Sequence, residues 1–163
     1  MRAALALAAV LALAACAKPA PAPSPDVTAA GKAFLIANAH QAGVTTTASG
    51  LQYRILHSGP ATGIRPKLAD EVKVNYEGKL IDGEVFDSSY QRGAPVAMTV
   101  RELVPGWREA LQLMRPGDEW LLYLPAKLGY GDKGAGPIPP GAVLVFKLEL
   151  IDVLPDATSI GRA

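Results

Sequence analysis

Side chains able to carry out covalent or metal chemistry are few and widely separated in this chain. The sequence has one cysteine, Cys16, and two histidines, His40 and His57, among 163 residues. A lone cysteine excludes an intramolecular disulfide framework, and with two scattered histidines it gives no set of zinc ligands. Since no glycine-rich phosphate loop is present either, we expect a function that needs no metal and no cofactor.

Two other polar residues stand out through their neighbours. Asp87 precedes Ser88-Ser89, and an Asp-Ser-Ser cluster at a strand end is typical of turns. Tyr130 lies between two glycines in a loop predicted to be exposed, so a place in the core explains it poorly. Four aromatic residues fall on predicted inward faces, where each alone would be typical of a core: Tyr76, Phe86, Trp107 and Phe146.

Acidic and basic side chains almost balance. Lysine plus arginine total 16 and aspartate plus glutamate 15, which gives a formal net charge of +1. Proteins that bind nucleic acid normally carry a basic patch or stripe, so the balance argues against that class. The length suits one compact domain with extensions.

Residues 1–15 have the composition of a secretory signal. Met1-Arg2 is followed by an alanine- and leucine-rich run that is too short to span a bilayer, which needs about 20 apolar residues. The run ends in Leu13-Ala14-Ala15-Cys16, which resembles the bacterial lipobox, where the cysteine becomes lipidated. The alternative is an ordinary signal peptide whose cleavage site happens to include Cys16.

Residues 16–26 follow as a tether with alternating prolines, a pattern that favours an extended polyproline II spacer. A lipid on Cys16 would make the anchor the sole membrane contact and would hold the domain in the cell envelope, facing the periplasm. Ala17, rather than aspartate, follows the cysteine, which favours the outer membrane if the cell is Gram-negative.

The remaining chain divides into three predicted parts. Residues 27–49 form a short helix, with Phe34, Leu35 and Asn38 on one side, and a connector. Residues 50–154 form the domain, and residues 155–163 a tail. Within the domain, Trp107, Ala110, Leu111 and Met114 have the spacing of an amphipathic helix. Apolar alternation predicts strands at 51–55, 72–77, 96–100, 119–124 and 144–150. The prediction is an α+β fold in which an antiparallel sheet of about five strands curls over one amphipathic helix.

The segments between these elements resemble the FKBP-type peptidyl-prolyl isomerases. They are, in order, residues 74–78, 82–89, 104–107, 124–131 and 138–146. Any one segment is weak support, since Asp-Gly is a common turn, but five in register are strong. The resemblance implies an FKBP-like fold, prolyl isomerase activity and proline-containing unfolded or exported polypeptides as partners.

The part before the domain resembles the macrophage-infectivity-potentiator type of this family, through Phe34-Leu35, Asn38 and Ser49-Gly50-Leu51-Gln52-Tyr53. Those relatives carry a long helical dimerisation arm at this point, whereas only about two dozen residues separate the tether from the domain here. We therefore expect a monomer.

The resemblance also implies a site. An apolar pocket would hold the proline ring, with Trp107 as its floor and Phe146 as its back wall. The hydroxyl of Tyr130 and the backbone N–H of Ile138 would bind substrate carbonyls, and Asp87 would face the reacting amide or order Tyr76. The catalytic set is then Phe86, Asp87 and Tyr130, and the substrate-binding set is Tyr76, Val96, Leu103, Val104, Trp107, Ile138 and Phe146.

One position departs from the family pattern. Many members have phenylalanine where this chain has Val96, so we expect a shallower wall and weakened binding of rapamycin-like macrolides. Because the fold is also reused without catalysis, the alternative function is a peptide-binding or chaperone module. A purely structural lipoprotein ranks last, because it leaves the pocket residues as coincidence.

Overall fold

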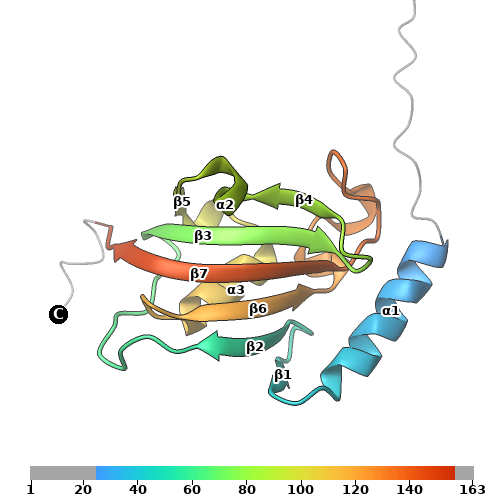
Figure 1. Cartoon of the computed structure of the whole chain (residues 1–163), viewed down its shortest axis with the longest axis horizontal. Helices are drawn as coiled ribbons and strands as arrows, with labels where there is room; N and C mark the ends of the chain where they lie inside the picture. The colour runs from blue at the N-terminus through green and yellow to red at the C-terminus, as the bar shows by residue number, and fades with distance from the viewer. Residues whose placement is uncertain (1–24, 157–163) are drawn as a thin grey trace, which may run out of the picture.

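The computed structural model describes residues 25–156. The predicted signal peptide, Cys16 and most of the tether and of the tail lie outside the described residues. Seven strands form one antiparallel sheet in the order β1-β2-β6-β7-β3-β4, with β5 paired to β3 (Figure 1). The elements are α1 (Pro25–Ala39), β1 (Val44–Thr46), β2 (Gln52–His57), β3 (Glu71–Leu80), β4 (Val85–Ser88), α2 (Ser89–Arg92), β5 (Val96–Thr99), η1 (Val100–Glu102), α3 (Pro105–Leu113), β6 (Glu119–Leu124), η2 (Ala126–Leu128), η3 (Gly131–Lys133) and β7 (Leu144–Leu154).

The predicted α+β class and the sheet over one amphipathic helix are confirmed. The five expected strands correspond to β2, β3, β5, β6 and β7. The structure adds β1 and β4, which have three and four residues and are too short to give a clear alternating pattern. The third expected strand also ends earlier than predicted, because Val100 begins the 3₁₀ turn η1.

The core lies between the sheet and α3, which crosses behind the sheet in Figure 1. From α3 and its cap, the predicted residues Trp107, Ala110, Leu111 and Met114 are all buried. The sheet contributes alternate residues of its longest strands, as a sheet with one covered face requires. These are Val72, Val74 and Tyr76 of β3, Trp120, Leu122 and Leu124 of β6, and Leu144, Phe146, Leu148 and Leu150 of β7.

The sheet curls around α3, and two of the pairings that β3 makes are irregular. The ladder between β3 and β7 shifts register between Lys73 and Val74, and the ladder between β3 and β4 shifts between Gly78 and Lys79. Such bulges bend a strand and increase its twist. The curl leaves a concave side where the C-terminal half of β3 faces the start of α3.

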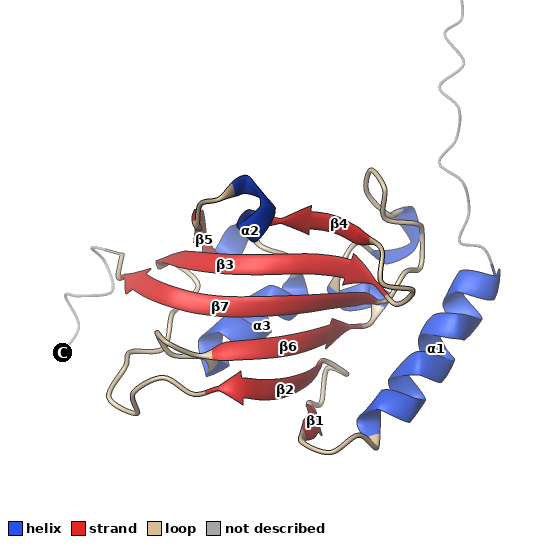
Figure 2. Ribbon diagram, in the orientation of Figure 1, coloured by secondary structure: helices blue, strands red, loops and turns tan. Residues whose placement is uncertain are grey.

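Helix α1 lies beyond the β1 end of the sheet (Figure 2) and packs on the domain through its predicted inner side. Phe34 lies 5.9 Å from Tyr123, centroid to centroid. The buried amide of Asn38 donates to Gln52 Oε1 at 2.8 Å, and Gln52 Nε2 donates to the carbonyl of Leu35 at 2.9 Å. Among the described residues, no helix is long and apolar enough to cross a membrane.

Candidate functional site

A pocket of about 240 Å³ opens on the concave side of the sheet. This volume is below the roughly 300–1,000 Å³ of pockets that hold drug-sized ligands, so the space suits a small ring and its neighbouring amide. We call it the aromatic pocket. Its lining residues are Tyr76, Phe86, Asp87, Met98, Glu102, Leu103, Val104, Trp107, Tyr130 and Phe146.

Four rings in edge-to-face contact build its walls. Trp107 is 4% exposed, and its ring centroid lies 5.1 Å from that of Tyr76 and 5.2 Å from that of Phe146. Phe86 meets Phe146 at 5.6 Å, and all three pairs have interplanar angles of 83–87°. Each such pair contributes about 0.5–1.5 kcal/mol beyond its buried area, so the contacts stabilise this arrangement of the rings.

The position of Trp107 follows from how α3 begins. Pro105 occupies the first turn of the helix, where its missing N–H costs nothing. A Cβ at Gly106 would lie 2.6 Å from Leu124 Cγ, so this glycine lets the first turn approach β6 closely. Trp107 is therefore pressed against the sheet beneath Tyr76 and Phe146.

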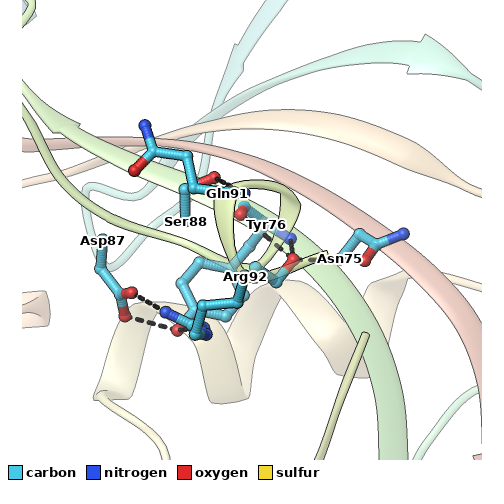
Figure 3. Close-up of polar contacts among 7 residues, drawn as sticks. Asn75, Tyr76, Asp87, Ser88, Gln91 and Arg92 are labelled. Atoms are coloured by element: carbon cyan, nitrogen blue, oxygen red, sulfur yellow. Dashed lines mark hydrogen bonds and ion pairs between the residues drawn. The ribbon is translucent and has the colours of Figure 1, made fainter. Parts of the chain in front are cut away.

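A polar network stands beside the rings (Figure 3). The hydroxyl of Tyr76 donates to Asp87 Oδ2 at 2.5 Å, and the Arg92 guanidinium donates to Asp87 Oδ1. Arg92 Nη2 also donates to the Tyr76 hydroxyl at 2.8 Å, and the guanidinium carbon lies 5.4 Å from the centroid of the Tyr76 ring. Both carboxylate oxygens of Asp87 are thus held by neighbouring side chains.

The Ser88-Ser89 pair positions this network. Ser88 caps α2 by accepting a hydrogen bond from the Gln91 N–H, and the fully buried Ser89 hydroxyl accepts one from the Tyr76 N–H at 2.8 Å. The one-turn helix therefore stays fixed to β3 and presents Arg92 toward Asp87 and Tyr76. The turn expected from Asp-Ser-Ser is present, and the helix that follows it brings Arg92 into contact with Asp87 and Tyr76.

The network also fixes the protonation of its members. Burial by itself would raise the pKa of the Asp87 carboxyl, but hydrogen bonds from Tyr76 and Arg92 outweigh it and lower that pKa below its usual value. Burial, and then the hydrogen bond to Asp87, raises the pKa of the Tyr76 phenol. At neutral pH, Asp87 is a carboxylate and Tyr76 is a neutral donor.

The lowered pKa of Asp87 predicts a pH-dependent contribution to stability. A carboxyl whose pKa falls on folding stabilises the folded state above its unfolded pKa of about 3.9, and this contribution is lost as the pH drops through the folded value. Because the Asp87 side chain is 41% exposed, water screens the effect and keeps it small.

The measurement compares the free energy of unfolding of the unchanged chain and of Asp87→Asn in urea at a series of pH values. We expect a difference that is constant above about pH 5 and shrinks below about pH 4. A difference that stays constant down to pH 3 would contradict the assignment of the ionised form.

Most of the residues expected in the site do meet in the aromatic pocket, but two do not line it. Ile138 is buried in the core, and its N–H donates to the Ala135 carbonyl at 2.8 Å, so it already has a protein acceptor. Val96 is half-buried against the core, and Met98, two residues further along β5, lines the pocket instead.

Three residues of the site were missed from the sequence. Met98 lies on the same face of β5 as Val96, so the alternation of that strand could have indicated it. Glu102 lines the pocket from the end of η1, and Arg92 binds Asp87 from α2. Both are charged residues in segments without periodicity, which gave no signal.

The described residues contain a second hollow, of about 320 Å³, between α1 and the β3–β4 turn. It has no aromatic wall, and Asp82 is its one charged residue: the lining is Val27, Ala30, Leu80, Ile81, Asp82, Pro139, Ala142 and Val143. The same part of the chain has no group of three histidine, cysteine, aspartate or glutamate side chains that could hold a metal ion.

Two sequence-family models match the chain. The one described as FKBP-type peptidyl-prolyl cis-trans isomerase matches residues 63–151, which include every residue that lines the aromatic pocket. The one described as the domain amino terminal to FKBP-type peptidyl-prolyl isomerase matches residues 9–55.

Individual proteins show the same similarity. The chain is 51% identical over 123 residues to the peptidyl-prolyl cis-trans isomerase Mip of Coxiella burnetii, covering 75% of this chain and 53% of that protein. It is 48% identical over 126 residues to the outer membrane protein MIP of Legionella longbeachae, covering 77% and 53%. The chain therefore spans about half the length of these two relatives.

A solved structure is covered more completely. The crystal structure of a peptidyl-prolyl cis-trans isomerase from Pseudomonas syringae pv. tomato matches with a TM-score of 0.74 and 36% identity. The match covers 83% of this chain and 98% of that one.

Proposed function

This chain belongs to the family of FKBP-type peptidyl-prolyl cis-trans isomerases, and we propose on that premise that its aromatic pocket catalyses the cis/trans isomerisation of Xaa-Pro bonds. The substrates are proline-containing segments of unfolded or exported polypeptides. The observation that carries the proposal is the set of four rings, held edge to face, with an ordered tyrosine–aspartate–arginine network beside them.

The chemistry needs little besides this shape. Rotation about the Xaa-Pro bond crosses a barrier of about 18–20 kcal/mol because amide resonance is lost in the twisted state. Uncatalysed exchange takes tens to hundreds of seconds. A pocket that binds the twisted amide better than either planar isomer lowers that barrier, and no bond has to be broken.

The rings supply the selective environment. The proline ring rests on the buried Trp107, while Phe86 and Phe146 close the opposite side. The twisted amide has lost resonance and with it much of its demand for hydration, so an apolar wall disfavours the planar forms more than the twisted one. We therefore assign Phe86 a direct part in catalysis.

Hydrogen-bond donors of the pocket would hold the substrate backbone on both sides of the twisted Xaa-Pro amide. Tyr130 is 41% exposed at the mouth, where its hydroxyl can donate to a substrate carbonyl. Because the Ile138 N–H is occupied by Ala135, we assign the second donor to Val104, which lines the pocket just before α3. Among the backbone hydrogen bonds that the described residues form in turns, loops and caps, none has the Val104 N–H as its donor.

Of the two roles open to Asp87, the geometry favours ordering. Its two oxygens accept hydrogen bonds from Tyr76 and Arg92, and its ionised form has no proton to donate to a substrate carbonyl. Asp87 then holds the Tyr76 ring at the edge of the pocket.

The proposed setting is the cell envelope. Support comes from the signal-like residues 1–15, the lipobox-like Cys16 and the proline-rich tether of residues 16–26, together with the name of the Legionella outer membrane protein. The chain would be lipid-anchored, face the periplasm and act as a monomer. Rapamycin-like macrolides would bind weakly, since Val96 stands where many relatives have phenylalanine.

The test uses residues 17–163, which contain every described element, in an NMR exchange experiment on a Leu-Pro peptide. We expect accelerated cis/trans exchange that falls at least about tenfold in Phe86→Ala, because the wall of the pocket is removed. Val85→Ala, at an exposed neighbouring position, serves as the control.

Unaccelerated exchange would refute the proposal. If peptide signals still shifted on binding, the chain would be a peptide-binding module. Suppression of client aggregation that survives Phe86→Ala and Asp87→Asn would point to a chaperone acting through another surface.

A further inference from the structure

The charged residues that line the aromatic pocket are both carboxylates, Asp87 and Glu102. Asp87 is compensated, since it is paired with Arg92 and accepts a hydrogen bond from Tyr76. Glu102 is exposed, and the ion pairs found among the described residues join Lys79 to Glu77, Arg92 to Asp87 and Lys147 to Glu119. The pocket mouth therefore has one carboxylate without a described cationic partner.

Neither of the cationic residues nearest in the sequence or on the facing loop lines the pocket or forms a described ion pair with Glu102. Arg101 precedes Glu102 and is exposed, but it is not among the residues that line the pocket. Asp132 and Lys133 follow Tyr130 on the facing loop, carry opposite charges and likewise do not line it. Among the residues that line the pocket, Glu102 is thus the one charged side chain that no described ion pair compensates.

Glu102 is also close to the place where the substrate chain must pass. It ends η1 and immediately precedes Leu103 and Val104, both of which line the pocket. An extended peptide advances about 3.3 Å per residue, so side chains next to the proline lie beside these residues while the proline ring occupies the pocket.

We propose that Glu102 determines substrate specificity by favouring Xaa-Pro segments with a lysine or arginine within two residues of the proline. Acidic residues at the same positions are disfavoured by repulsion between like charges. The inference rests on the proposed isomerase function and names its substrate class, which is basic proline-containing segments. Glu102 acts by charge at the mouth and takes no part in the rotation itself.

The experiment measures kcat/KM by NMR exchange on one Leu-Pro host peptide with lysine, glutamine or glutamate placed before the leucine or after the proline. We expect the lysine peptides to exceed the glutamate peptides by about two- to fivefold at low salt, the range of an exposed ion pair. The ratio shrinks toward one in high salt, because screening shortens the reach of the charge.

Three variants test whether Glu102 itself causes the preference for lysine peptides. Glu102→Gln should remove the lysine preference, and Glu102→Lys should reverse it, whereas Glu84→Gln, at an exposed turn outside the pocket, should retain it. Equal rates for lysine and glutamate peptides, or a preference that survives Glu102→Gln, would overturn the inference while leaving the isomerase intact. Loss of catalysis on all three peptides with the unchanged chain would instead refute the proposed function.

Discussion

A single methyl group added at Gly78 is expected to lower kcat/KM for prolyl isomerisation by about ten- to hundredfold while the sheet stays folded. A Cβ at this position would lie 2.6 Å from Phe146 Cε1 and 2.7 Å from Phe86 Cε2. Both rings are walls of the aromatic pocket, so relief of the clash must push them into the space that the proline ring needs. Overpacking of this kind also costs about 1–3 kcal/mol of stability.

Urea unfolding and the Leu-Pro exchange assay together test this prediction. Lys79→Ala, next to Gly78 on the strand but directed to the other face, is the control and should change neither quantity much. Combining Gly78→Ala with Phe86→Leu should cost less stability than the sum of the two single changes, because the smaller side chain makes room. Full activity in a folded Gly78→Ala variant would show that the ring positions do not govern the rate.

The second large effect is expected at Trp107. Replacing this buried indole with alanine removes the floor of the pocket and its edge-to-face contacts with Tyr76 and Phe146. Such truncations cost about 3–5 kcal/mol, a large share of the 5–15 kcal/mol that stabilises a typical domain. We expect both a lower urea midpoint and loss of isomerase activity in the fraction that remains folded.

Trp120 gives a matched comparison. It is equally buried at 4% exposure and stacks on Tyr53 at 4.5 Å, but it does not line the pocket. Trp120→Ala should therefore lose similar stability and keep its activity per folded molecule. If the two variants lost activity equally, the loss at Trp107 would reflect general destabilisation rather than removal of the floor.

The regular part of the fold could be predicted because burial of one face imposes a period on the sequence. In β3 and β7 the apolar residues recur at every second position, and in α3 they recur with helical spacing. Helix α1 could also be placed by its inner residues Phe34, Leu35 and Asn38. Strands β1 and β4 could not, since three or four residues do not establish a period.

The site was predictable where its residues also belong to regular elements. Tyr76, Trp107 and Phe146 lie on inward faces, and the family resemblance predicted that these three side chains line a pocket. Site residues positioned by loops were harder to predict, because a loop can direct a backbone N–H inward without any periodic pattern in the sequence. The Ile138 N–H is bound to Ala135, and Arg92 reaches the network through a one-turn helix; neither contact has a signature in the sequence.

The long pairing of β3 with β7 has a consequence for how the chain folds while it is being synthesised. Tyr76 and Phe146 face one pocket although about 70 residues of chain separate them. Contacts of such long range are slow to form, because the entropy cost of closing a large loop comes before the favourable contacts that offset it. While the chain is being made, β3 has its β7-facing edge open until the last strand emerges, and open edges are prone to aggregation. Until β7 has been synthesised, the growing chain is therefore itself prone to aggregation.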